Sequence, residues 1–163
     1  MTPPPASPTV SLEALWIAQA MRDVPWLYST VSTVHILGFV ILVGAVVMFD
    51  LRVLGLSKQI PVRALARHLL PWSVAALLLV VPTGLAMFAT HATELIASRV
   101  FLVKMCLVLA AGMNAAIFHT GPYMSVAAWD VRAKAPLGAR ACMVVSIAIW
   151  VAVIACGRQL PER

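Results

Sequence analysis

The sequence contains four histidines, and all of them lie within or at the ends of strongly apolar stretches. An ionisable side chain is costly to place in lipid, so each of these histidines is a candidate functional group. His35 lies inside the stretch "STVHILGFVILVGAVVMFD", about 12 Å along a helix from Leu27 at a rise of about 1.5 Å per residue. His68 and His91 flank a second apolar stretch, and His119 closes a third.

Alternating directions of these stretches would place His35 and His91 near one face of a membrane, and His68 and His119 near the other. Haem iron takes imidazole as an axial ligand, and helix bundles hold cofactors between facing helices. We therefore interpret all four histidines as candidate metal and cofactor ligands. The expected cofactor is one or two molecules of haem b, with one pair of histidines for each haem.

The spacing of the histidines restricts this arrangement. His68 and His91 are about 34 Å apart along a straight helix, which exceeds a hydrocarbon core of about 30 Å. His35 also lies roughly two turns deeper than His91. A kink at a proline of the second stretch would change this register. Otherwise Met87 or Met105 would have to complete the ligation at His35, or the iron would be five-coordinate.

Each histidine also has an ordinary structural interpretation. His68 and His91 fit solvated residues at the membrane surface, and His119 fits a hydrogen bond to a carbonyl at the end of its helix. His35 fits a neutral imidazole bonded to a Ser or Thr of a neighbouring helix. Asn114, in the middle of the third stretch, is expected to form a hydrogen bond between helices.

The composition identifies the class of protein. Of the 163 residues, 62% are hydrophobic and only 11% are charged, and the mean hydropathy is +0.95. Soluble domains have about 45–50% apolar and about 25% charged residues, so this is a membrane protein. The formal charge of +6 is expected to reside in loops beside the membrane rather than in a nucleic-acid site.

Four apolar stretches are each long enough to cross a bilayer as a helix. They cover residues 27–49, 71–90, 100–120 and 137–156. Runs this continuous do not fit a barrel, so the expected fold is an all-α membrane protein with an up-down bundle of four transmembrane helices over residues 27–156. The three cysteines lie inside apolar stretches, which argues against a disulfide framework.

The segments outside the bundle are expected to be short. Residues 1–10 lack the features of a signal peptide and are predicted to be a disordered tail, and residues 157–163 a polar tail. Residues 11–24 are predicted to form an amphipathic helix that ends before Pro25. This helix could lie in the membrane interface or pack on a neighbouring subunit.

Other polar residues indicate orientation and local contacts. Basic residues are more frequent in the connections after the first and third stretches, so these loops are expected to be cytoplasmic and both termini to lie outside. Asp50 and Arg52 are expected to form a local ion pair or to anchor the helix end. Asp130 is expected to cap a helix or to pair with Arg132 or Arg140. No phosphate loop, nucleophile elbow or CxxC motif is present, and enzymatic activity remains undecided.

Several motifs carry a family resemblance over roughly Val24 to Arg158. They are "VHILGFVILVGAVVMFDLRVLG", "LLPW", "PTGLAMF", "NAAIFH", "AAWD", "PLGARA" and "WVAVIACGR". In this order they resemble a largely uncharacterised family of small four-helix proteins of the bacterial inner membrane, which implies termini in the periplasm. The family pattern includes histidines that match His35 and His119, but not His68 or His91. More distantly, the layout is similar to transmembrane b-type cytochromes and to membrane copper-transport domains.

These observations lead to three functional hypotheses. The first is a haem b-binding electron-transfer subunit that passes electrons between quinone, or a membrane or periplasmic redox partner, and the other membrane face. The second is a non-catalytic structural subunit of a larger membrane complex. The third is a copper or other metal transport protein, because the eight methionines and three cysteines are soft ligands.

Overall fold

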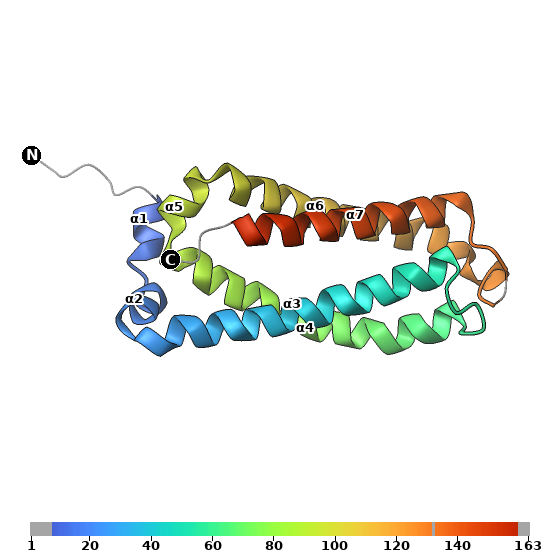
Figure 1. Cartoon of the computed structure of the whole chain (residues 1–163), viewed down its shortest axis with the longest axis horizontal. Helices are drawn as coiled ribbons and strands as arrows, with labels where there is room; N and C mark the ends of the chain where they lie inside the picture. Colours follow the sequence, from blue (N-terminus) through green and yellow to red (C-terminus); the bar gives the residue numbers. More distant parts are fainter. Residues whose placement is uncertain (1–7, 132, 160–163) are drawn as a thin grey trace, which may run out of the picture.

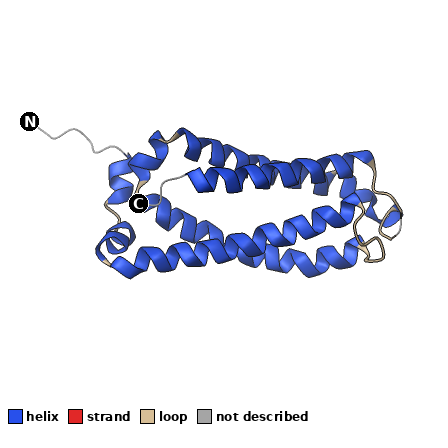
Figure 2. Ribbon diagram, viewed as in Figure 1, coloured by secondary structure: helices blue, strands red, loops and turns tan. Residues whose placement is uncertain are grey.

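Four long helices form the body of the protein in a computed structural model that describes residues 8–131 and 133–159 (Figure 1). They are α3 (Pro25–Leu54), α4 (Val62–Thr90), α6 (Arg99–Thr120) and α7 (Leu137–Gln159). Each is long and apolar enough to cross a membrane, and the described residues contain no strand (Figure 2). The predicted fold class is therefore confirmed, and the chain is a multi-pass membrane protein.

The first two long helices extend beyond the apolar stretches that predict them. α3 continues five residues past residue 49 to Leu54, and α4 begins at Val62 instead of at Pro71. α3 ends at Gly55, whose φ of 119° lies in the left-handed region that glycine adopts without strain. Both Pro71 and Pro82 lie inside α4. The extensions are helical turns that carry polar residues beyond the apolar core, so hydrophobicity alone cannot reveal them.

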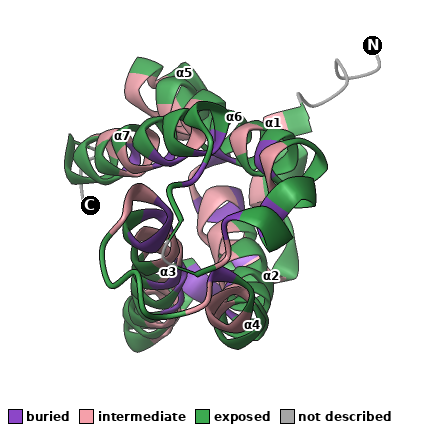
Figure 3. Cartoon of the chain, turned by 90° about the vertical axis from the view of Figure 1, so that its right-hand side faces the viewer, coloured by how far each residue is buried: buried purple, intermediate pink, exposed green. Residues whose placement is uncertain are grey.

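The long helices pack as two antiparallel pairs, α3 with α4 and α6 with α7, and α3 also packs on α7 (Figures 1 and 3). Gly38 shows how closely the first pair approaches. A Cβ atom at Gly38 would lie 2.9 Å from Val80 Cγ2 and 3.3 Å from Leu79 Cδ2. The absence of a side chain at Gly38 therefore lets α3 and α4 come together, as small residues do in other membrane helix pairs.

The N-terminal segment forms two short helices that cover one end of the bundle (Figure 1). They are α1 (Pro8–Glu13) and α2 (Trp16–Asp23), where the sequence predicts one helix over residues 11–24. Ala18 and Met21 are buried on α2, which packs against α4 and α3. The apolar face of this segment is thus covered in part by its own chain, while Leu15 and Trp16 stay exposed. Residues 1–7 of the predicted tail lie outside the described residues.

Two polar contacts hold this N-terminal cap in place. The Arg22 guanidinium donates to the carbonyl of Thr90, the last residue of α4, at 2.9 Å. The Glu13 carboxylate accepts a hydrogen bond of 2.8 Å from the backbone N–H of Thr93 in α5 (Ala92–Ala97). The cap is therefore fastened to the α4–α5 junction.

The contact between Glu13 and Thr93 predicts a local pH dependence. The hydrogen bond from the Thr93 backbone holds the pKa of Glu13 below its ordinary value. Because the pKa is lowered on folding, the tether is complete above the ordinary carboxyl pKa and is lost as the pH falls through the lowered one. We expect the Thr93 amide resonance, followed by NMR, to titrate below about pH 4.3. The Glu13→Gln variant should abolish this titration, and a Thr93 shift that persists in that variant would contradict the assignment.

The best-packed apolar cluster lies at the opposite end, where the connections meet. There η1 (Pro122–Ala128) follows α6 and packs on α6 and α7. The buried members of this cluster are Val53, Val62, Phe118, Val126, Trp129, Ala135, Ala139 and Met143. In the long helices, by contrast, large apolar side chains are exposed over much of the outer surface (Figure 3). This surface suits a lipid bilayer.

Candidate functional site in the bundle

His35 is the candidate that the fold holds most firmly. Its half-buried imidazole projects from α3 onto α4, where Nδ1 lies 3.1 Å from the carbonyl oxygen of Val80 and 3.0 Å from Oγ1 of Thr83. A carbonyl only accepts, so Nδ1 carries the proton and donates it. The Thr83 hydroxyl donates in turn to the carbonyl of Leu79 at 2.6 Å, which leaves its lone pairs for His35.

This tautomer leaves the other ring nitrogen of His35 as a lone-pair donor. Nε2 has no hydrogen-bond partner within the described residues. A histidine that binds a metal commonly donates its second ring N–H to a carbonyl in this way, because the bond orients the ring and raises its basicity. With Nδ1 as the donor, His35 could hold a metal ion or haem iron through Nε2.

Gly84 makes room for the His35 ring. A Cβ atom at Gly84 would lie 3.0 Å from Cε1 of His35. Any side chain at this position would press on the imidazole, so the absence of one on α4 is needed for the observed position of the ring. The structure thus assigns Gly84 of α4 to His35.

Lys104 is a second polar group of the same region that the sequence did not predict. It lies on α6, is partly buried, and is within range of an electrostatic influence on His35 across the bundle. Its Nζ lies 3.9 Å from the place of a Cβ atom on Gly157 of α7. The signal in the sequence that could have revealed it is a lysine five residues into an apolar stretch.

The structure does not bring His35 and His91 together. His91 lies at the junction of α4 and α5, where its ring meets the edge of Tyr28 at a centroid distance of 5.9 Å. His35 contacts α4 at Val80 to Gly84, at least seven residues earlier, which is about 10 Å along the helix. The two prolines inside α4 do not remove this offset.

The other two histidines also remain apart. His68 is exposed on α4, and His119 is exposed on α6, which has no extended packing against α4. His119 Nδ1 lies 2.8 Å from the carbonyl of Ala115, one turn earlier, and its ring lies 5.4 Å from that of Tyr123. The carbonyl contact matches the ordinary interpretation of His119. No contact among the described residues links His68 with His119, so nothing there prepares a site for one haem between them.

No cluster of three or more His, Cys, Asp or Glu side chains could hold a metal ion in residues 8–131 and 133–159. The cysteines Cys106, Cys142 and Cys156 are free thiols. A metal ion that needs three such side chains as ligands therefore has no prepared site among these described residues. Haem iron differs, because it needs only one or two axial ligands.

A separate polar group lies near the other end of the bundle. Asp50 of α3 is only 2% exposed and faces the Ser146 hydroxyl of α7 within hydrogen-bonding reach, but its Oδ2 has no partner among the described residues. Asn114 Nδ2 donates to the carbonyl of Cys142 at 2.9 Å. The predicted hydrogen bond between helices is thus confirmed for Asn114, and it joins α6 to α7.

The expected ion pair of Asp50 with Arg52 does not form. The buried Arg52 guanidinium donates instead to the carbonyl oxygens of Lys58, Ile60 and Asp130. Residues two apart on a helix do not face each other, so their side chains diverge. Asp130 accepts a hydrogen bond of 2.8 Å from the backbone N–H of Arg63, which is the capping role predicted for it.

The fold and site define a helical membrane protein with four spans and a histidine held between two of them. The chain belongs to a family of unknown function, DUF6644, whose sequence profile matches residues 16–161. No curated protein and no solved structure matches the chain.

Proposed function

We propose that this protein is an integral membrane electron-transfer subunit that binds haem b through His35. The observation that carries the proposal is the ring of His35, whose Nδ1–H is donated to Val80 and Thr83 while Nε2 keeps its lone pair. Haem b, when bound, would supply a one-electron carrier. The electrons would pass between quinone, or a membrane or periplasmic partner, and the other membrane face.

The surroundings of His35 support one haem better than two. Lys104 of α6, when protonated, would offer a positive charge to a propionate group of haem. A second protein ligand to the iron would come from a methionine, because His91 lies about 10 Å farther along α4. His68 and His119 are exposed and lie on helices that do not pack extensively against each other, so they offer less support for a second haem.

The location is proposed together with the function. The α3–α4 and α6–α7 connections lie at the same end of the bundle, and they carry the excess of basic residues (Figure 1). By the positive-inside rule, this end would face the cytoplasm of a bacterium. Both termini would then lie on the periplasmic side of the inner membrane.

A reduced-minus-oxidised absorption spectrum of protein purified from haem-replete cells tests the proposal. We expect the α- and Soret-band changes of a b-type haem in the wild type and their loss in His35→Ala. Gly84→Leu should weaken them as well, because the leucine would displace the ring. His68→Ala is the matched control and should keep the spectrum.

Two results would reject this function. One is a folded wild-type protein without haem bands, and the other is a His35→Ala variant with the wild-type spectrum and haem content. Size-exclusion chromatography of each variant separates loss of haem from loss of folding.

One observation favours a structural subunit as the second candidate. α6 buries only Ala111 and Phe118, fewer residues than each of the other three long helices. A partner subunit could cover the rest of α6. Co-purification of a defined partner in mild detergent, with no haem in the complex, would favour this function.

A further inference from the structure

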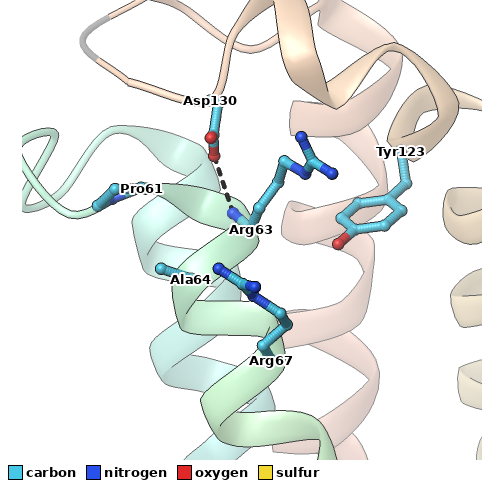
Figure 4. Close-up of a pocket in the computed structure, with 6 residues that line it drawn as sticks. All are labelled: Pro61, Arg63, Ala64, Arg67, Tyr123 and Asp130. Atoms are coloured by element: carbon cyan, nitrogen blue, oxygen red, sulfur yellow. Dashed lines mark hydrogen bonds between the residues drawn. The ribbon is translucent and has the colours of Figure 1, made fainter.

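A pocket at the connection end of the bundle is lined by two arginines of α4. It has a volume of about 540 Å³, and its lining residues are Pro61, Arg63, Ala64, Arg67, Tyr123 and Asp130 (Figure 4). Figure 4 shows the Arg63 side chain extending toward Tyr123, with the Arg67 side chain lying farther along α4. α4 and η1 together therefore form a concave basic surface.

The charge of this pocket is not balanced within the described residues. Both arginines are exposed, and neither guanidinium has a hydrogen-bond or ion-pair partner there. Asp130 is the one acidic residue in the lining, and its Oδ1 accepts the backbone N–H of Arg63 at 2.8 Å. Two cations thus face one carboxylate that already caps α4.

A second basic pocket lies at the same end. Its volume is about 210 Å³, and its lining includes Arg52, Lys58, Lys134 and Arg140. The Arg52 guanidinium is occupied by backbone carbonyls. The other three side chains add positive charge near the first pocket and raise the attraction for an anion.

An apolar stripe continues from the two arginines along α4. Residues 63, 67, 70, 74 and 78 follow the three- and four-residue spacing that places them on one helix face. Leu70, Val74 and Leu78 are all exposed, at 56%, 50% and 72%. The same face of α4 therefore presents two guanidinium groups at its start and apolar side chains in the membrane span.

We propose that this surface binds an anionic phospholipid, with Arg63 and Arg67 holding the phosphate and the stripe below them contacting an acyl chain. Guanidinium groups bind phosphate oxygens in bidentate geometry. Basic pockets beside membrane helices bind anionic head groups. A soluble phosphate shares the head-group chemistry, but it would not use the stripe of Leu70, Val74 and Leu78. The continuity of charge and apolar surface on one face favours the lipid.

Lipid binding to the full-length protein in non-ionic detergent tests this proposal. Phosphatidylglycerol is titrated and the bound lipid is counted by native mass spectrometry, with phosphatidylcholine as the zwitterionic comparison. Each arginine is expected to contribute about five-fold to the affinity, so the double variant Arg63→Gln with Arg67→Gln should weaken phosphatidylglycerol binding about 25-fold. Arg63→Lys with Arg67→Lys should fall between this variant and the wild type, because charge is kept and bidentate bonding is lost.

A matched control uses the opposite end of the bundle. Arg99→Gln with Arg158→Gln also removes two exposed arginines and should leave phosphatidylglycerol binding unchanged. Equal binding by the Arg63/Arg67 and Arg99/Arg158 variants would overturn the proposal. Inorganic phosphate is tested at constant ionic strength. If it displaces the lipid through the same two arginines, the site is for soluble phosphate and the lipid assignment is wrong.

Discussion

The Arg52→Ala variant is expected to lose about 3–5 kcal/mol of its free energy of unfolding, which is a large effect for a single substitution. Arg52 is only 4% exposed, and its guanidinium lies 3.2 Å from the carbonyl oxygen of Lys58 and 3.0 Å from that of Asp130. It also donates to the carbonyl of Ile60. Hydrogen bonds to a charged donor are stronger than neutral ones, and truncation leaves all three carbonyls without this donor.

The consequence of this substitution should be specific to the connection end. Arg52 joins α3 to the segment before α4 and to the segment after η1, so its removal should loosen both connections. Unfolding in mixed detergent measures the free energy, and hydrogen exchange at residues 55–61 locates the loss. Arg52→Lys should remain clearly destabilised, because an ammonium cannot reproduce the planar fork. Arg140→Ala is the exposed control, and equal stability of the Arg52 and Arg140 variants would contradict the role of Arg52.

The second large effect is expected for Phe118→Ala, at about 3–5 kcal/mol. Phe118 is 2% exposed and belongs to the apolar cluster at the connection end. Its ring meets those of Phe49 and Tyr123 at centroid distances of 5.7 Å and 5.6 Å. Truncation would leave a cavity between α3, α6 and η1 that these neighbours cannot fill, because their backbones are held by separate helices.

A neighbouring residue provides the comparison for Phe118. Ile117 is 54% exposed, so Ile117→Ala removes a side chain of similar chemistry from the lipid-facing surface and should cost less than about 1 kcal/mol. Phe118→Leu should fall between the two. Detergent unfolding followed by tryptophan fluorescence is suitable, because Trp129 lies in the same cluster. Similar losses for Ile117→Ala and Phe118→Ala would show that the cluster does not hold this end together.

The transmembrane helices could be predicted from the sequence because hydrophobicity decides which segments enter lipid. A bilayer forces each long apolar stretch into a helix that satisfies its own backbone, whatever its neighbours are. The third and fourth stretches, residues 100–120 and 137–156, match α6 and α7 closely. The amphipathic N-terminal segment could be recognised, but not its break into two helices or its packing on α4.

The candidate site could be predicted only in part, because spacing gives depth along a helix but not the neighbour that a side chain meets. The sequence correctly predicted that His35 lies inside a long apolar helix. The alternative prediction, that its imidazole bonds to a threonine of a neighbouring helix, was also correct. The sequence could not show that His35 faces Val80 and Thr83 of α4. Those contacts depend on which helices pack together and on their rotation.

The sequence by itself determined the class of this protein, its four candidate spans and the position of each histidine along them, because composition and helical rise are properties of one segment. Only the tertiary structure decided which polar groups meet. It pairs α3 with α4 through Gly38 and leaves α4 without extended packing on α6. His35 is therefore held by a carbonyl and a hydroxyl, while His68 and His119 remain apart. The physical reason is that lipid solvates any apolar helix surface about equally well. Close packing between particular helix surfaces therefore selects which helices become neighbours.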